Sequence, residues 1–173
     1  NTSEKDMEYV SMETDYVVGL AGKSGNPSPK TALGVFYGIK AALQYVFGDD
    51  DISKYTFAVQ GAGQTGYYLI KYLLEAKAKK IYFTEINQKY IKRMQEEHSE
   101  VELVGVNDIY SLDVDVFSPC ALGGSLNDET IPQIKAKIVA GSANNALFDE
   151  EKHGMMLRER GILYAPDFVI NAG

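Results

Sequence analysis

The longest regular pattern of apolar positions lies between residues 28 and 48. Its apolar side chains recur at the i, i+3, i+4 and i+7 spacing of an amphipathic helix: Ala32, Val35, Phe36, Ile39, Ala42, Leu43, Val46 and Phe47. Ser28 is predicted as the N-cap of this helix, Pro29 as its first residue and Gly48 as its end. The prolines within residues 23–29 exclude regular structure just before it.

Beyond residue 50 the chain alternates between strand-like and helix-like patterns. Strands are predicted over residues 55–59, 80–84, 101–104, 114–118, 137–140 and 162–164. Helices are predicted over residues 64–76, 88–97, 128–134 and 149–160. This alternation implies βαβ units, and therefore an α/β fold with a mainly parallel sheet and helices on both faces. Near the N-terminus residues 2–6 resemble a helix N-cap with an acid three residues on, which predicts a short helix, and residues 16–20 are predicted to be extended.

The composition narrows the class of protein. A chain of 173 residues with 45% hydrophobic content suits one folded domain. Its net charge of −7 argues against nucleic acid and anionic membranes as partners, and no apolar run is long enough for a membrane span. The single cysteine, Cys120, fits a reducing cytoplasm. Asn1 and Gly173 resemble cut points rather than natural termini, so we expect this chain to be part of a longer protein.

A glycine-rich motif follows the strand predicted over residues 55–59. Residues 61–66 read Gly-Ala-Gly-Gln-Thr-Gly, which is the G-x-G-x-x-G pattern of dinucleotide-binding proteins. Gly61 would permit the tight turn, Gly63 the approach of a pyrophosphate, and Gly66 the close packing of helix on strand. The start of the next helix offers free N–H groups to the phosphates. The motif therefore predicts a Rossmann-type, doubly wound sheet.

An acidic residue lies where such a fold would need one for the adenosine ribose. Glu85 ends the strand predicted over residues 80–84 and follows Gly66 by 19 residues. Its carboxylate would accept from both ribose hydroxyls and repel a 2′-phosphate, which favours NAD over NADP. Lys89 and Arg93 lie close enough in sequence to weaken that preference, and Glu85 could also be an ordinary polar residue at a strand end.

Further motifs resemble one family along the whole chain in order. They are residues 24–29 (Ser-Gly-Asn-Pro-Ser-Pro), 31–32, 34–35, 107–110 (Asn-Asp-Ile-Tyr), 118–124 (Ser-Pro-Cys-Ala-Leu-Gly-Gly), 127–132 (Asn-Asp-Glu-Thr-Ile-Pro), 140–145 (Ala-Gly-Ser-Ala-Asn-Asn), 153–154 and 164–173 (Tyr-Ala-Pro-Asp-Phe-Val-Ile-Asn-Ala-Gly). On these motifs the chain resembles the glutamate/leucine/phenylalanine/valine dehydrogenases, and most of all the leucine dehydrogenases. The resemblance implies an NAD-dependent enzyme that oxidatively deaminates an L-amino acid to a 2-oxo acid and ammonia.

The resemblance also implies roles for individual residues. Gly61, Ala62, Gly63, Gln64 and Thr65 would hold the pyrophosphate, with Glu85 on the adenosine ribose and Ile86 beside the adenine. Other residues would surround the nicotinamide riboside: Thr31, Cys120, Ala121, Leu122, Asn144 and Asn171. Cofactor and amino-acid substrate would meet at three asparagines: Asn144, Asn145 and Asn171.

The same resemblance divides the enzyme into domains. Residues 1–173 would form a single dinucleotide-binding domain, in which residues 1–30 provide an N-terminal helix and a loop leading in. The substrate domain, with the catalytic lysines and aspartate, would lie upstream, and C-terminal helices would follow. No catalytic residue is therefore expected within this chain, which should bind NAD but be inactive alone. The full-length enzyme is expected to be a cytoplasmic homo-oligomer.

Without the family, several of these residues have plainer interpretations. A lone cysteine after an apolar strand is usually a small buried residue, so an inert Cys120 is favoured. His98 and His153 lack metal-ligand spacing, and no metal site is predicted. Residues 142–145 could form a simple turn. Two other functions also fit a glycine loop followed by an acid: a non-catalytic NAD-sensing module and an S-adenosylmethionine-dependent methyltransferase.

Overall fold

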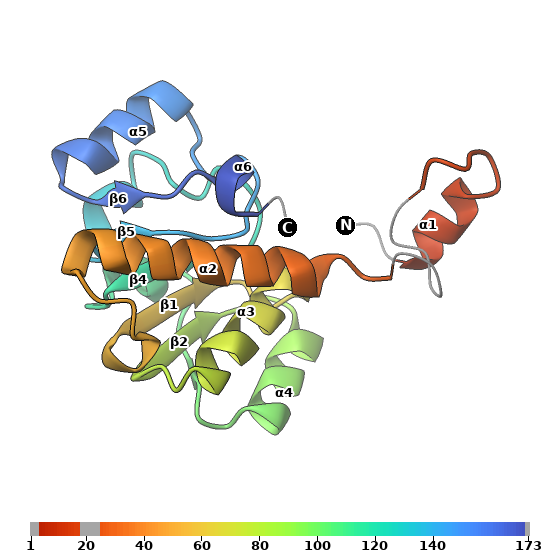
Figure 1. Cartoon of the computed structure of the whole chain (residues 1–173), viewed down its shortest axis with the longest axis horizontal. Coiled ribbons are helices and arrows are strands. Elements are labelled where there is room, and N and C mark those ends of the chain that lie inside the picture. The colour runs from red at the N-terminus through yellow and green to blue at the C-terminus, as the bar shows by residue number, and fades with distance from the viewer. Residues whose placement is uncertain (1–3, 18–24, 172–173) are drawn as a thin grey trace.

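A six-stranded parallel sheet forms the centre of the molecule (Figure 1). The computed structural model describes residues 4–17 and 25–171. The strands are β1 (Thr56–Gln60), β2 (Lys80–Thr84), β3 (Glu102–Leu103), β4 (Val116–Pro119), β5 (Ile138–Val139) and β6 (Leu163–Tyr164). They lie in the order β3-β2-β1-β4-β5-β6, and every pair is parallel. The predicted doubly wound parallel sheet is confirmed.

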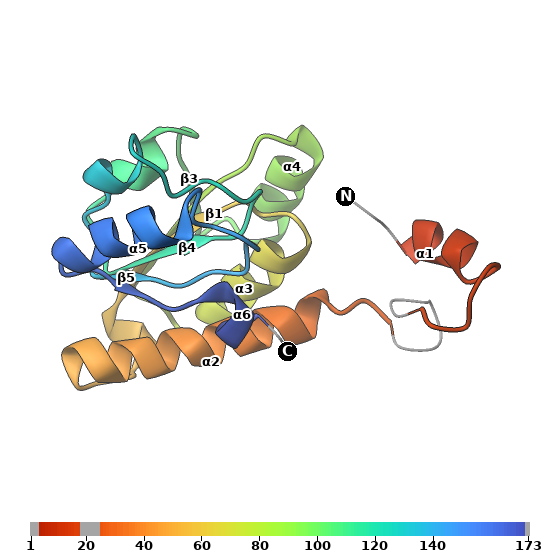
Figure 2. The same ribbon diagram turned by 90° about the horizontal axis from the view of Figure 1, so that it is seen from above.

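Helices cover both faces of this sheet (Figure 2). On one face lie α2 (Ser28–Phe47), α3 (Gln64–Glu75), α4 (Gln88–Glu97) and the short α6 (Asp167–Ile170). The other face is covered by α5 (Glu150–Glu159) and two 3₁₀ turns, η2 (Asp108–Ser111) and η3 (Ile131–Gln133). A third turn, η1 (Ile52–Lys54), leads into β1. Among the described residues, no helix combines the length and apolar character needed to cross a membrane.

Two hydrophobic cores follow from the alternation of side chains along each strand. Phe57 and Val59 of β1 and Phe83 of β2 point towards α2 and α3, and each is fully buried. Ala58 of β1 and Phe117 of β4 point to the opposite face, in the core beneath α5. A parallel sheet needs cover on both faces, which explains why its strands are nearly continuously apolar.

The N-terminal part contributes to neither core over its described residues. Helix α1 (Glu4–Val10) is present, as predicted, whereas residues 2–3 of the predicted cap segment lie outside the described residues. Of the segment predicted to be extended, residues 16–17 have no regular structure and 18–20 lie outside the described residues.

The start of α2 differs from the prediction. Ser28 is already helical, and Pro27 occupies the N-cap position without a side-chain cap. A residue before the N-cap position provides the cap instead, because the side chain of Asn26 accepts a hydrogen bond from the Ser28 N–H at 2.9 Å. At the other end, Gly48 adopts a left-handed conformation and ends the helix as predicted.

The prediction of a helix over residues 128–134 was wrong. Only the three-residue turn η3 forms there. The Asn127 side chain accepts from the N–H groups of Glu129 at 3.0 Å and Thr130 at 3.1 Å. Such local side-chain bonds compete with helix formation, and Pro132 removes a further donor.

Candidate functional site

The direction in which strands are added reverses between β1 and β4, and the loops after these two strands meet there. Such a reversal is where doubly wound sheets form a ligand crevice at the carboxyl ends of their strands. The glycine-rich turn after β1 is fixed to both neighbours. The Gly61 N–H donates to the Thr84 carbonyl of β2 at 2.8 Å, and the Cys120 N–H after β4 donates to the Gln60 carbonyl at 2.8 Å.

Two glycines of the loop are required by the protein itself. Gly61 has φ of +93°, a left-handed conformation that other residues rarely adopt. Gly66 lies in the first turn of α3, where an added Cβ would be only 1.9 Å from the Gly61 carbonyl oxygen. Helix α3 therefore rests directly on the loop, as expected for the last glycine of this motif.

Gly63 is different, because the space beside it is open. A Cβ built at Gly63 would have Tyr90 Cε2 as its nearest neighbour, at 3.8 Å, which is an ordinary contact. Gly63 is the N-cap of α3, so the N–H groups of Gln64 and Thr65 belong to the first turn and have no acceptor within the helix. Open space, free donors and the positive end of a helix dipole form a cradle that fits a pyrophosphate.

Glu85 lies beside this cradle, at the end of β2, and is partly exposed. Its Oε2 accepts from the Ala62 N–H at 2.9 Å. Its Oε1 accepts from the N–H groups of Ile86 at 2.8 Å and Asn87 at 2.9 Å. Glu85 therefore holds the glycine loop and the turn after β2, and a carboxylate has room for about four such bonds. Ile86 is 78% exposed next to it.

The loop after β4 carries Cys120, Ala121 and Leu122. Ala121 packs against Gly61, whose added Cβ would be 3.1 Å from the Ala121 Cβ and backbone nitrogen. Burial raises the pKa of the Cys120 thiol, and hydrogen bonding with Ser142 only partly opposes this rise. A thiol held protonated in this way is a poor nucleophile. Leu122 is 76% exposed on the rim.

The structure brings together two asparagines that lie 27 residues apart. The Asn171 side chain donates to Asn144 Oδ1 at 2.8 Å and to the Ser142 carbonyl at 3.3 Å. Asn145 follows in a left-handed conformation, with φ of +51°. These residues end the segments after β5 and β6, at the same edge of the sheet as the glycine loop.

Thr31 lies in the first turn of α2. Two hydrogen bonds tie the start of this helix to α3. The Asn26 side chain donates to Gln64 Oε1 at 3.3 Å, and the Tyr72 hydroxyl donates to the Pro29 carbonyl at 3.2 Å. Thr31 itself is partly buried, and its N–H donates to the Pro27 carbonyl at 3.0 Å.

Sequence reasoning missed several polar residues beneath and beside the loop. The Gln60 amide, which is buried, donates to the Tyr110 hydroxyl at 2.5 Å. Asp167 accepts from the Asn145 N–H at 3.0 Å and from the Tyr164 hydroxyl at 3.3 Å. The sequence held a signal for Gln60, which is a polar residue between the apolar strand and Gly61.

The histidine His153 is a packing residue. Its side chain is buried, and its Nδ1 accepts from the Asp149 N–H at 2.9 Å. Asp128 lies 3.5 Å from its Nε2. Over residues 4–17 and 25–171, no group of three histidine, cysteine or acidic side chains is placed to hold a metal ion.

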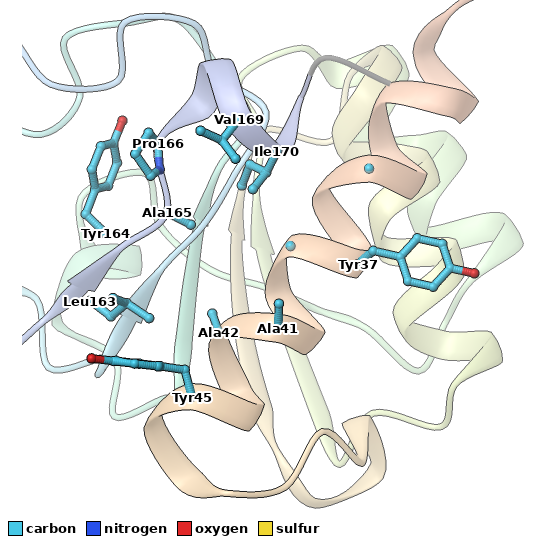
Figure 3. A pocket seen from close by; sticks show the side chains of 12 residues that line it. Tyr37, Ala41, Ala42, Tyr45, Leu163, Tyr164, Ala165, Pro166, Val169 and Ile170 are labelled. Atoms are coloured by element: carbon cyan, nitrogen blue, oxygen red, sulfur yellow. The ribbon is translucent and has the colours of Figure 1, made fainter.

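An apolar groove of about 760 Å³ lies to one side of this crevice, between α2 and the chain that runs from β6 into α6 (Figure 3). Tyr37 and Tyr45 of α2 and Leu163, Pro166 and Val169 opposite them line it. The glycine loop and Glu85 do not contribute to this groove, so it is separate from the crevice.

Fold and site together define a doubly wound, Rossmann-type domain. Residues 79–173 match the family described as glutamate/leucine/phenylalanine/valine dehydrogenase. That match covers more than half of the chain, and the chain belongs to this family.

Individual relatives agree with this assignment. The chain is 50% identical over 175 residues to leucine dehydrogenase of Geobacillus stearothermophilus, covering 99% of this chain and 47% of that protein. It is 43% identical over 179 residues to phenylalanine dehydrogenase of Lysinibacillus sphaericus, covering 99% and 46%. The crystal structure of L-tryptophan dehydrogenase from Nostoc punctiforme superimposes with a TM-score of 0.84 at 41% identity, covering 99% and 48%. The chain thus spans about half the length of the curated relatives it matches.

A more distant structure shares the fold. The hetero-hexameric glutamate dehydrogenase from Thermus thermophilus superimposes with a TM-score of 0.74 at 19% identity, covering 99% of this chain and 46% of that one.

Proposed function

We propose that this chain is the NAD-binding domain of an NAD-dependent L-amino-acid dehydrogenase of the leucine or branched-chain type. The observation that best supports this proposal is the open cradle at Gly63 with Glu85 fixed beside it, in a chain that is 50% identical to a leucine dehydrogenase. Residues 1–173 form one dinucleotide-binding domain in this proposal, with residues 1–30 leading in. The substrate domain and the C-terminal helices belong to the rest of the enzyme.

Each predicted site residue has a place in this proposal. Gly61, Ala62, Gly63, Gln64 and Thr65 would hold the pyrophosphate, with the first N–H groups of α3 as donors. The Glu85 carboxylate, with about one of its four acceptor positions still open, would accept from a ribose hydroxyl of the adenosine, and Ile86 would lie beside the adenine. The other residues face the nicotinamide riboside: Thr31, Cys120, Ala121, Leu122, Asn144 and Asn171.

In the proposed reaction an L-amino acid and water would become a 2-oxo acid and ammonia, and the chemistry that bound NAD would supply is that of a hydride acceptor. The residues of this chain bind and orient the cofactor, and Asn144, Asn145 and Asn171 line the point at which substrate meets it. Fixed polar groups of this kind promote reaction by holding reactants in place rather than by proton transfer. Lysines and an aspartate of the substrate domain carry out the acid–base chemistry. We therefore expect this chain alone to bind NAD without deaminating leucine.

The surroundings of Glu85 favour NAD over NADP. A carboxylate at this position repels a 2′-phosphate. Arg93 is engaged elsewhere, because its guanidinium carbon lies 3.4 Å from the centre of the Tyr67 ring and its Nε donates to Glu97 at 3.4 Å. An arginine held in this way does not offer a free partner to a 2′-phosphate.

Calorimetric titration of the purified chain with NAD, NADP and S-adenosylmethionine tests the proposal. We expect NAD to bind in preference to the other two. Glu85→Gln should weaken NAD binding by roughly tenfold, the effect of losing one charged hydrogen bond, and should reduce the preference over NADP. Glu96→Gln is a matched control, since Glu96 lies on α4 within 3.7 Å of Lys92. Absence of NAD binding, preference for S-adenosylmethionine, or deamination by this chain alone would refute the proposal.

The assembly of the full-length enzyme is part of the same proposal. The glutamate dehydrogenase that shares this fold is hetero-hexameric. We propose that the full-length protein is a homo-oligomer, which sedimentation of that protein would test.

A further inference from the structure

The turn after β5 contains an unusual backbone conformation. Asn145 has φ of +51°, and among the described residues only Lys77 is another non-glycine residue with positive φ. Asparagine tolerates this conformation better than most residues, but it persists only where the surroundings hold it. Asn145 directly follows Asn144, one of the residues assigned to the nicotinamide, so whatever holds Asn145 also orients Asn144.

Two groups hold this turn from opposite sides. The Asn145 N–H donates to Asp167 Oδ2 at 3.0 Å, and the Asn145 carbonyl accepts from the Gly124 N–H at 2.8 Å. Gly123 lies against the same turn, because an added Cβ there would be 2.6 Å from the Asn144 carbonyl oxygen. The loop after β4 and the first residue of α6 therefore hold the turn between them.

Asp167 also holds the second asparagine. Its backbone carbonyl accepts from the Asn171 N–H at 2.8 Å. Its side-chain Oδ1 accepts from the Tyr164 hydroxyl at 3.3 Å. Burial, and then the charge of Asp167, raise the pKa of Tyr164 to about 12, so this hydroxyl remains a donor at neutral pH. One residue thus joins β6, the Asn145 turn and Asn171.

We propose that Asp167 is a positioning residue that sets the Asn144–Asn171 pair at the nicotinamide end of the cofactor site. The proposal rests on the proposed function, because it is the dinucleotide that Asn144 and Asn171 would contact. The bond between these side chains, at 2.8 Å, joins two segments that are also connected by the donation of the Asn171 side chain to the Ser142 carbonyl at 3.3 Å and by the Asp167 carboxylate, which accepts from the Asn145 N–H at 3.0 Å. Without the carboxylate, Asn145 would lose the hydrogen bond of its N–H, and Asn144 would be held less firmly in the orientation that meets Asn171.

Two ligands that differ only at the nicotinamide separate this role from a general one. The chain is titrated with NAD and with ADP-ribose, which retains the adenosine, pyrophosphate and second ribose but lacks the nicotinamide. Asp167→Ala should weaken NAD binding by about tenfold, which corresponds to one charge-assisted hydrogen bond, and change ADP-ribose binding less than about twofold. Asp167→Asn keeps an acceptor for the Asn145 N–H and should remain within about threefold of the wild type for both ligands.

Asp128→Ala is the matched control. Asp128 also carries charged hydrogen bonds, accepting from Lys152 at 2.7 Å, but it lies in the loop before η3 and not at the crevice. This variant should bind both ligands like the wild type. Unfolding midpoints above the titration temperature establish that each variant is folded.

Each outcome bears on one of the two proposals. Equal weakening of NAD and ADP-ribose by Asp167→Ala, or no weakening of either, overturns the positioning role. The positioning role is also overturned if Asp167→Asn binds NAD as weakly as Asp167→Ala, because the charge of Asp167 and not its hydrogen bond would then matter. A wild-type chain that binds neither ligand instead refutes the proposed function.

Discussion

Gly66→Ala tests whether α3 rests on the glycine loop as closely as the structure indicates. The new Cβ would be 1.9 Å from the Gly61 carbonyl oxygen, about 1.5 Å short of ordinary van der Waals contact. Neither side can easily move. Gly61 is bonded to Thr84 of β2, and the inner side chains of α3, Leu69 and Ile70, are fully buried.

The expected loss of folding free energy in Gly66→Ala is at the upper end of the range that overpacking produces. Extra atoms in a packed core typically cost about 1–3 kcal/mol, and more where backbone must shift. We expect Gly66→Ala to lose at least about 3 kcal/mol of folding free energy. For a chain of this size each kcal/mol lowers the unfolding midpoint by roughly 2–4 °C, so the midpoint should fall by about 6–12 °C.

Gly154→Ala provides the control within the same chain. Gly154 also lies in a helix, α5, but a Cβ there would be 3.9 Å from its nearest neighbour. This substitution should be neutral or stabilise by up to about 1 kcal/mol, because alanine favours the helix. Thermal unfolding followed by circular dichroism compares the two variants. If Gly66→Ala unfolded within about 2 °C of the wild type, the close packing of α3 on the loop would be refuted.

Three further predictions concern single side chains. The pKa of Tyr164, about 12 in the folded chain, exceeds the ordinary tyrosine value of 10.0, so the folded state keeps the proton to higher pH and the wild type should lose stability between pH 10 and 12. Urea unfolding should show a larger loss in the wild type than in Tyr164→Phe, by at most about 2.7 kcal/mol and less for a partly exposed ring, and equal losses in the two proteins would contradict this. Cys120 should be alkylated by iodoacetamide at pH 8 more slowly than after unfolding, because burial raises its pKa; equal rates by mass spectrometry would contradict this. Asp149→Ala should cost about 1 kcal/mol in urea unfolding, since it removes the helix cap on the Lys152 N–H at 2.8 Å; an unchanged midpoint would exclude that role.

The central part of the fold was predictable because its determinants are local. The strand before Gly61, the glycine spacing, the helix after it and the acid at the next strand end all lie within residues 55–85. Each element satisfies its own pattern there: apolar strand, glycine turn, amphipathic helix. The structure matches these predictions to within a residue or two, with β1 at Thr56–Gln60 and α3 at Gln64–Glu75.

Elements held by distant contacts were not predictable. Helix α6 has only four residues, too few for a periodic pattern, and Ile170 within it packs against Gly38 of α2. Asp167 precedes three apolar residues and gives no sign in the sequence that it bonds to Asn145, which is 22 residues away. Likewise Asn26, and not Ser28, caps α2, since the choice depends on how the preceding loop turns.

Glu85 shows that a structural role and a binding role can belong to the same side chain. Its three bonds to the N–H groups of Ala62, Ile86 and Asn87 account for its position without any ligand. Those bonds also fix both carboxylate oxygens before a cofactor arrives and leave acceptor capacity unused. A side chain already ordered loses little entropy on binding, so each hydrogen bond to a ribose would contribute more to affinity. The structural bonds are therefore an argument for the ribose site and not against it.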